Sequence, residues 1–440
     1  MEEKNLNENK ALEAKETDAL QKNKSFSSAA VFVVGAIILI IVLAFVLLML
    51  SKPRADFTTQ LYFSQTADGE YWVSAGNAKG FKKIIIPEYY NDQKVVGISS
   101  SGFKGCKKLE TIVIPDSIKY VGADAFDGCT SLSYNKYGNA IYIGTESNPY
   151  HILLEIEDKM LECDIHPNTK TLAGGAFAVS YITNIKIPEG VGYIGEKTFY
   201  DCKNLKSVEI PKSVTYIGED AFMFCGRIVE VVNNSSFKIT KESDDHGSVG
   251  LYALDIHSGK SKIVNRDGYL FYYYSGLTYL IGYTGEDTRL VLPESYNGRD
   301  YRIYKYCFYN NKSITSVVIS DGVSSIEYAA FSGCSNLSSI TISENVRSIG
   351  ENAFSYCESL TSITIPESVT SIGDHAFCDC SSLTGITIPD SVTSIGEGAF
   401  QSCLDLKDVY FTGSEEEWNA ISVSTDGNYN LTEATIHYNN

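Results

Sequence analysis

The stretch that decides the fold is residues 360–382, LTSITIPESVTSIGDHAFCDCSS. Its phenylalanine and its second cysteine recur every 23 residues through the last part of the chain, at Phe331, Phe354, Phe377, Phe400, Cys334, Cys357, Cys380 and Cys403. A fixed period of this length is the signature of a solenoid, in which each repeat forms one coil that stacks on the next. The sequence therefore predicts a stack of coils rather than a globular core.

Each position of the repeat has a physical reason. Ile363 and Ile365 alternate, so both side chains point to one face of a short strand. Gly373 is expected to supply a turn conformation that a Cβ atom would resist. Phe377 is expected to fill the interior, and Cys380 to act as a small buried apolar group.

A single repeat cannot fold alone. It buries about six large apolar side chains, each worth roughly 1.5–3 kcal/mol. Ordering one repeat costs about 1–2 kcal/mol for each of its backbone units. Stability is therefore expected only when neighbouring coils stack and pair their strands on both sides.

The repeat resembles the BspA-type leucine-rich repeat family of microbial surface proteins. The resemblance rests on the I-P, I-G and A-F-x-x-C motifs of the quoted stretch. The segment DVYFTGSEEEWNAIS at residues 408–422 adds to it, because it is similar to the module that closes such arrays. The resemblance implies a right-handed leucine-rich-repeat solenoid of parallel β-strands with short turns and helical pieces. It also implies display at the cell surface, adhesion or ligand binding, and no catalytic residues. The pattern departs at Glu327, which replaces the glycine, and at Ser180 and Asn311, which replace the cysteine.

The repeat rhythm is interrupted twice, which sets the expected organisation. Turn signals at Asp68-Gly69, Asp267-Gly268 and Ser275-Gly276 predict hairpins before each array. Ser414 and Glu417 form a capping-box pattern for a short terminal helix. The expected segments are a disordered cytoplasmic tail (1–25), a transmembrane helix (26–51), an N-terminal capping hairpin (55–83), a first leucine-rich-repeat array (84–232) with an insert (131–168), an insert and module that starts the second array (233–289), a second array (290–412) and a C-terminal cap (413–440).

The membrane segment rests on residues 31–50, VFVVGAIILIIVLAFVLLML, which contain no charged residue. As a helix this run spans about 30 Å, the thickness of a bilayer's hydrocarbon core. A buried core helix and a cleaved signal peptide are the alternatives, but the exit sequence LSKPRA does not resemble a cleavage site. A small excess of lysines before the run favours a cytoplasmic N-terminus. The prediction is a single-pass plasma membrane protein whose repeat domain is extracellular.

Charge and motifs exclude several function classes. The formal net charge is −18, and such an acidic chain repels phosphate backbones, so no nucleic acid partner is expected. The sequence contains no phosphate-binding glycine loop, nucleophile elbow or zinc-protease motif, so we expect no enzyme, catalytic residue or cofactor. Asp244-Asp245-His246 is the one cluster of acids with a histidine. It is read as a solvated loop, with a metal site as the alternative.

The cysteines that follow phenylalanine permit two readings. Successive coils are about 4.8 Å apart, whereas the Cβ atoms of a disulfide are about 3.8 Å apart with a specific twist. Free, buried thiols are therefore predicted, and disulfides between neighbouring coils, such as Cys106–Cys129 and Cys202–Cys225, are the alternative. The eight cysteines concerned are Cys106, Cys129, Cys202, Cys225, Cys334, Cys357, Cys380 and Cys403.

The strand positions between two inward residues face away from the core and are expected to form a concave binding face. A regular Ser/Thr surface is also what repeat drift produces, so the pattern does not require a ligand. The aromatic segment 265–283 is a second candidate surface, or a hairpin packed as a cap. The candidate binding residues on the concave face are Lys186, Glu209, Thr341, Thr364, Thr387 and Tyr410.

These observations predict a membrane-anchored cell-surface protein that binds a protein or glycan of a host or neighbouring cell without catalysis. One alternative is a scaffold with the same repeats that faces the cytoplasm, where free thiols persist. Another is a carbohydrate-active module in residues 226–290.

Overall fold

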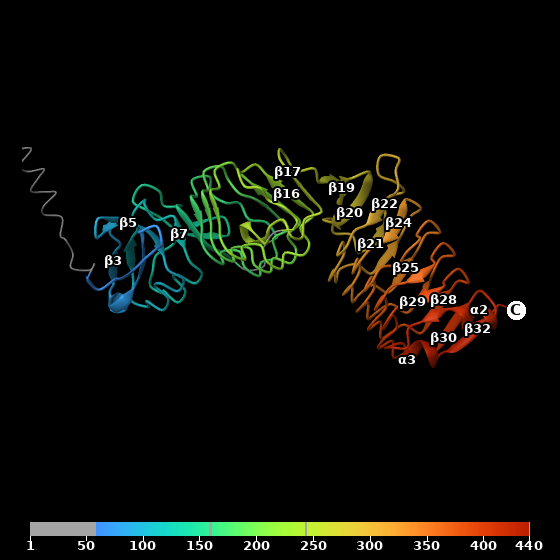
Figure 1. Ribbon diagram of the computed structural model, residues 1–440. Coiled ribbons are helices and arrows are strands. Elements are labelled where there is room, and N and C mark those ends of the chain that lie inside the picture. Colours follow the sequence, from blue (N-terminus) through green and yellow to red (C-terminus); the bar gives the residue numbers. More distant parts are fainter. Residues whose placement is uncertain (1–58, 158–160, 243, 440) are drawn as a thin grey trace, which may run out of the picture.

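The chain is an elongated stack of coils, as the repeat predicts (Figure 1). The computed structural model describes residues 59–157, 161–242 and 244–439. The axis of the stack changes direction near residue 260, so a first array and a second array are visible as separate runs of coils. The predicted tail 1–25 and transmembrane helix 26–51 lie outside the described residues. Within the described ranges, no helix is both long enough and apolar enough to cross a bilayer.

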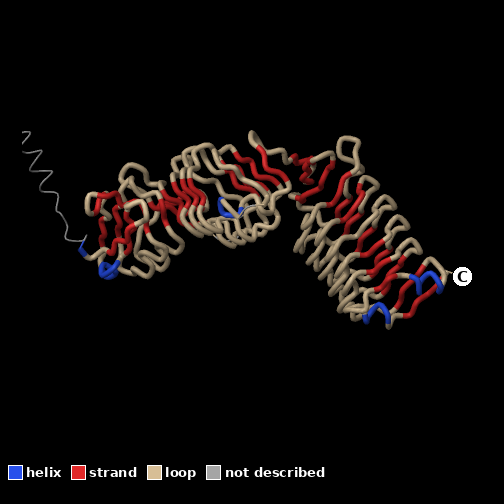
Figure 2. Tube along the Cα trace, in the orientation of Figure 1, coloured by secondary structure: helices blue, strands red, loops and turns tan. Residues whose placement is uncertain are grey.

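Each regular coil contributes two short strands, and strands of successive coils pair in parallel in two rows (Figure 2). We call the row built from the I-x-I positions the first arm. Its strands are β3 (Lys83–Ile85), β6 (Thr111–Val113), β12 (Asn184–Lys186), β14 (Ser207–Ile210), β16 (Glu230–Asn233), β17 (Asp255–His257), β21 (Arg289–Val291), β23 (Ser316–Val318), β25 (Ser339–Thr341), β26 (Ser362–Thr364), β28 (Gly385–Ile388), β30 (Asp408–Phe411) and β32 (Thr435–Tyr438).

The second arm is the row that precedes the glycine of the repeat. Its strands are β5 (Gln93–Ile98), β7 (Tyr120–Val121), β11 (Thr171–Leu172), β13 (Tyr193–Ile194), β15 (Tyr216–Ile217), β22 (Tyr301–Ile303), β24 (Val323–Ile326), β27 (Ser371–Ile372), β29 (Ser394–Ile395) and β31 (Ser422–Val423). Long turns connect the two arms and close each coil.

Hairpins begin both arrays. The antiparallel pair β1 (Tyr62–Gln65) and β2 (Tyr71–Ser74) turns at Gly69, whose φ is 84°, and β2 pairs in parallel with β5. The antiparallel pair β19 (Tyr269–Tyr274) and β20 (Leu277–Tyr283) turns at Ser275 and Gly276, and β20 pairs in parallel with β22. Each predicted hairpin therefore exists and offers the edge on which the next coils add. Two further strands pair antiparallel beside them, β4 (Tyr89–Tyr90) with β5 and β18 (Val264–Arg266) with β19, and the short 3₁₀ helices are η2 (Gly76–Gly80) and η3 (His246–Ser248).

The inward and outward positions of the repeat follow the prediction. Ile363 and Ile365 are buried, whereas Thr364 between them is exposed. The phenylalanine rings of successive coils stack face to face, with Phe354 and Phe400 each 5.4 Å from the centroid of Phe377. This column of rings is the continuous interior that no single coil possesses.

The repeat glycine has a different role from the one expected. Gly373 does not adopt a positive φ; the left-handed residues of that coil are His375, at 54°, and Asp379, at 57°. A Cβ atom on Gly373 would instead lie 2.6 Å from the backbone nitrogen of Glu351 in the preceding coil. The prediction of a special turn conformation was therefore wrong. The glycine is needed because two coils approach each other too closely there for any side chain.

The repeat cysteines are free and buried, which confirms the prediction for all eight. They also do more than fill space. The Sγ of Cys380 donates to the carbonyl oxygen of Phe354 in the preceding coil, at 3.2 Å, and Cys403 does the same to Phe377 at 3.1 Å. Each carbonyl also accepts the backbone N–H of the cysteine in its own coil. The thiol therefore serves a second lone pair of a buried carbonyl, a role that an alanine cannot fill.

Thiol reactivity offers a test of this arrangement. Burial raises the pKa of Cys334 and Cys403 to about 12, so few thiolates form near neutral pH, and the thiolate is the nucleophile. Because all eight repeat cysteines are buried, we expect them to resist iodoacetamide at pH 8 in the native protein and to react fully in denaturant without reductant. Mass spectrometry of the unreduced, denatured chain measures this. Linked peptides from neighbouring coils would contradict the thiol ladder.

The insert that first interrupts the repeat forms three strands that separate two core clusters of the first array. β8 (Asn135–Tyr137), β9 (Ala140–Ile143) and β10 (Ile152–Ile156) extend the sheet of β11, β13 and β15. Neighbouring residues on these strands face opposite sides. Ile143 and Ile152 belong to a core cluster of residues 61–173, whereas Tyr142 and Leu153 belong to a second cluster of residues 140–253.

The two arrays meet through a small apolar cluster and a cation. Val229 of the first array is buried with Tyr272 and Tyr304 of the second. Arg227 lies 4.6 Å from the ring centroid of Tyr309, and its Nη1 donates to Asn204. The bend in Figure 1 is therefore a packed junction.

The C-terminal end is closed by a short helix and a last strand. α2 (Glu415–Ala420) begins with the predicted capping box, because the Ser414 hydroxyl accepts the N–H of Glu417 and the Glu417 carboxylate accepts the N–H of Ser414. Trp418 packs edge-on against Phe411, 5.2 Å away. Beyond α3 (Tyr429–Thr432), β32 pairs with β30 and covers its edge.

Candidate functional site

The structure places the predicted binding residues in two separate groups on the exposed side of the first arm. In the first array Lys186 and Glu209 lie in register and form an ion pair, 3.7 Å between Nζ and Oε2. In the second array Thr364, Thr387 and Tyr410 are register partners on successive strands, and we call such a row of register partners a file. Thr341 lies on the adjacent strand β25. Their role in binding stays a prediction.

The file in the second array ends in a compact polar group. The ring of Tyr410 stacks on His437 with centroids 4.8 Å apart. The His437 Nε2 is 2.7 Å from a carboxylate oxygen of Asp408. These contacts join the last two strands of the first arm, β30 and β32, so the three side chains have a structural role that requires no ligand.

A second surface, which the sequence analysis missed, lies on the second arm of the first array. It consists of four partly exposed aromatic residues, Trp72, Tyr120, Tyr193 and Tyr216, and we call it the aromatic platform. Trp72 stacks on Tyr120 with centroids 5.7 Å apart and an interplanar angle of 13°. Tyr193 and Tyr216 meet Tyr120 edge-on at 5.0 and 5.1 Å. Side chains from the N-terminal hairpin and three coils thus form one continuous surface.

Small residues between these aromatics make the platform possible. Trp72 rests directly on Gly97, since a Cβ there would lie 2.7 Å from the indole ring. Thr171 occupies the coil between Tyr120 and Tyr193, and its hydroxyl is bound to the carbonyl of Lys119, so its side chain is buried. Large residues at either position would push the rings apart.

Polar groups border the platform. The Nζ of Lys119 lies 6.0 Å from the ring centroid of Tyr193. Glu196 lines the same shallow depression, of about 40 Å³, and accepts a hydrogen bond from Ser100. Burial raises the pKa of Tyr120, so its hydroxyl remains a neutral donor at physiological pH. Aromatic faces with polar groups at the edge suit a ligand that is apolar on one face and hydroxylated at its rim.

A signal for the platform was present in the sequence. The tripeptide before the repeat glycine reads Y-V-G or Y-I-G at Tyr120, Tyr193 and Tyr216, whereas the second array has S-I-G at the same place. Trp72 carries no such signal, because it comes from the hairpin and joins the row only through the pairing of β2 with β5.

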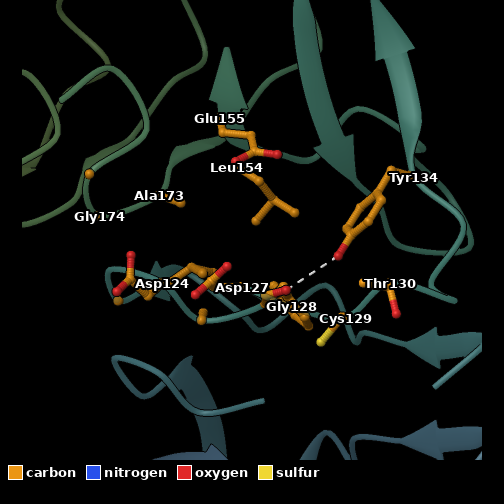
Figure 3. Close-up of a pocket in the computed structure, with 15 residues that line it drawn as sticks. Asp124, Asp127, Gly128, Cys129, Thr130, Tyr134, Leu154, Glu155, Ala173 and Gly174 are labelled. Carbon is orange, nitrogen blue, oxygen red and sulfur yellow. Dashed lines mark hydrogen bonds between the residues drawn. The ribbon is translucent and has the colours of Figure 1, made fainter. Parts of the chain in front are cut away.

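A larger cavity, of about 320 Å³, opens where the insert leaves the first array (Figure 3). Asp124 and Asp127 line one wall, and Glu155 and Tyr134 extend from the opposite side. Both aspartates are paired with Lys104, at 3.0 and 2.9 Å. The Tyr134 hydroxyl donates to the carbonyl of Phe126. These groups satisfy one another, so the cavity is read as part of the array's structure.

Metal chemistry finds no support in the described residues. Among residues 59–157, 161–242 and 244–439, no three His, Cys, Asp or Glu side chains converge as metal ligands. His246 of the acidic loop instead packs against Phe237, with centroids 4.4 Å apart.

Comparison with known proteins identifies a matching family. A model for BspA-type leucine-rich repeat regions matches residues 77–148, 158–278 and 301–423, most of the chain. The search of curated proteins found no match to this chain. Solved structures of other proteins are also similar to this chain. A leucine-rich cell surface protein of Faecalibacterium prausnitzii is 24% identical, covers 83% of this chain and 97% of its own, and has a TM-score of 0.48. The pneumococcal vaccine antigen PcpA is 17% identical, with coverages of 86% and 96% and a TM-score of 0.46.

Proposed function

The chain belongs to the BspA-type leucine-rich repeat family, and from this membership we propose that it is a non-catalytic binding protein displayed at the cell surface. The observation that carries the proposal is the aromatic platform. A solenoid has no need to leave four aromatic rings partly in water along one row of strand positions, since the later coils of the second array have Ser371, Ser394 and Ser422 in the equivalent row. The ligand is a glycan or protein of a host or neighbouring cell.

The geometry of the platform favours a neutral glycan. A pyranose ring presents a face of C–H groups that packs on an aromatic ring, while its hydroxyls point to the rim. Stacked Trp72 and Tyr120 supply the faces, and Lys119 and Glu196 supply groups for hydroxyls. A row of rings across several coils suits an extended chain of sugars better than a single monosaccharide.

Substitution of the platform tests this proposal. We expect Tyr120→Ala to weaken binding of a neutral polysaccharide such as β-glucan or mannan by at least about tenfold, which corresponds to ~1.4 kcal/mol. Tyr120 contacts every other ring of the platform, so its loss removes several stacking surfaces. Isothermal titration measures the change after a glycan array has selected the polysaccharide.

Tyr181→Ala is the matched control, because Tyr181 is exposed in the same array and lies outside the platform. Its affinity should equal that of the parent. If the parent binds no neutral glycan, or if both variants bind equally well, the platform is not a glycan site.

Display at the surface rests on the N-terminal apolar run, and it has its own test. We expect carbonate extraction to leave the chain in the membrane pellet, because residues 31–50 contain 20 consecutive uncharged residues. Protease added to intact cells should remove the repeats. Protection of the repeats in intact cells, with cleavage after lysis, would support the cytoplasmic scaffold instead. Release into the carbonate supernatant without proteolysis would contradict the anchor.

A further inference from the structure

A groove at the start of the second array collects positive charge in an otherwise acidic protein. Its volume is about 690 Å³, and it is bordered by the β19–β20 hairpin, the turn before β22 and the next two coils. Three of the chain's seven arginines, Arg299, Arg302 and Arg347, line it. We call it the arginine groove.

The three guanidinium groups are only partly engaged by the protein. Arg299 is exposed and lies 5.4 Å from the ring centroid of Tyr273. The Nη1 of Arg302 is 3.9 Å from Glu327, the limit of an ion pair. Arg347 is exposed and forms no ion pair with any residue that the structure describes.

Two carboxylates, Asp300 and Glu327, line the groove as well. Glu327 is the residue that replaces the repeat glycine in this coil. Burial raises its pKa, although Arg302 opposes the shift. Because the arginines outnumber the carboxylates, the groove has a net positive charge, whereas the whole chain has −18.

One hydroxyl group beside the arginines lacks a hydrogen-bond partner. The Ser325 side-chain oxygen is buried, belongs to the lining of this groove, and has no hydrogen-bond partner among the described residues. An unsatisfied buried hydroxyl costs about 1–3 kcal/mol. Ser324 beside it is satisfied by the carbonyl of Tyr301. The Ser325 side chain as a whole is partly exposed, so a rotation toward the groove would let its hydroxyl bind an oxygen of the ligand.

The register shows how the fold builds this site. Arg302 pairs with Tyr279 on one side and Ser325 on the other, so it occupies the second-arm file that carries the aromatic platform in the first array. The coils that follow place Ser371, Ser394 and Ser422 in that file. The same file therefore presents rings in one array and a cation followed by hydroxyls in the other.

We propose that the arginine groove binds the carboxylate or sulfate group of an acidic polysaccharide. Arginine forks match such oxyanions in geometry and remain charged at every physiological pH. The hydroxyl and amide side chains of Ser348 and Asn345 line the same groove and suit sugar hydroxyls. A nucleic acid requires a long cationic track, which the acidic chain does not provide. The site is separate from the platform and takes a ligand of different chemistry.

The test uses the full chain in a mild nonionic detergent, with hyaluronan as the probe that carries carboxylates alone and chondroitin sulfate as the probe that carries carboxylates and sulfates. At least one probe should bind, and affinity should fall as salt rises from about 50 to 300 mM. Arg347→Gln and Arg299→Gln should each weaken binding by about tenfold. Arg289→Gln removes the same charge from the first arm of the same array, outside the groove, and should change affinity less than about twofold.

Ser325→Ala separates binding from folding. The variant loses an unsatisfied hydroxyl, so its thermal midpoint should stay equal or rise, while its affinity for the probe falls. Tyr120→Ala should bind the acidic probe normally, so failure of the platform proposal leaves this one standing. Binding of neither probe, or equal losses in Arg289→Gln and Arg347→Gln, would overturn the proposal.

Discussion

Replacing Phe377 by alanine should destabilise the second array by about 3–5 kcal/mol, the usual loss when a buried aromatic side chain leaves a cavity. Phe377 is fully buried, and its ring is stacked between Phe354 and Phe400. Both neighbouring coils therefore lose a contact surface along with the substituted coil. Urea unfolding followed by far-ultraviolet circular dichroism, compared with the parent chain, measures the loss.

Thr364→Ala is the control from the same coil. Thr364 stands between two buried isoleucines but faces solvent, so its substitution should change the free energy of unfolding by less than about 0.5 kcal/mol. Comparable losses in both variants would mean that the inward and outward positions are reversed.

Gly373→Ala should also be costly, by about 1–3 kcal/mol, although it adds a single methyl group. The new Cβ would lie 2.6 Å from the nitrogen of Glu351 and 2.7 Å from the carbonyl carbon of Gly350. Both atoms are backbone and cannot move without separating the coils, so the strain resembles overpacking of a core. The urea midpoint should fall, and amide hydrogens of the two coils should exchange faster.

Gly385→Ala makes the same chemical change one coil later, on the first arm. Its new Cβ would meet nothing closer than 3.5 Å, and no positive φ is required there. We expect no loss of stability and a small gain, because alanine reduces the freedom of the unfolded chain. A loss in Gly385→Ala equal to that in Gly373→Ala would show that close approach of coils is not the reason for the repeat glycine.

Much of the fold was predictable because each repeat has apolar residues at the same positions. Strand alternation and the 23-residue period identify the inward residues, and the structure buries Ile363, Ile365 and Phe377 as expected. The free thiols follow from the spacing of coils, and the capping box at Ser414 follows from local chemistry. These features depend on contacts within a coil or with an identical neighbour, so the sequence contains them.

The roles of two residues of the repeat were harder to predict than the fold itself. Gly373 and Cys380 were read as a turn residue and an apolar filler. Both act on the adjacent coil, through close backbone approach and through a thiol hydrogen bond to Phe354. A repeat pattern shows which residue type returns, whereas only the stacked structure shows which atom of the neighbouring coil it meets.

The sequence by itself determined the solenoid, its family resemblance and the face that each repeat buries. The tyrosines of the aromatic platform had a signal in the sequence, but only the tertiary structure decided that Trp72 joins them and that the arginine groove forms. Trp72 reaches Tyr120 because the hairpin strand β2 pairs with β5, and Arg299 and Arg347 line one groove although they belong to different coils. The physical reason is that a surface site needs side chains from different coils at the same file position. Inserts and hairpins break the 23-residue period, so only strand pairing fixes which residues become neighbours.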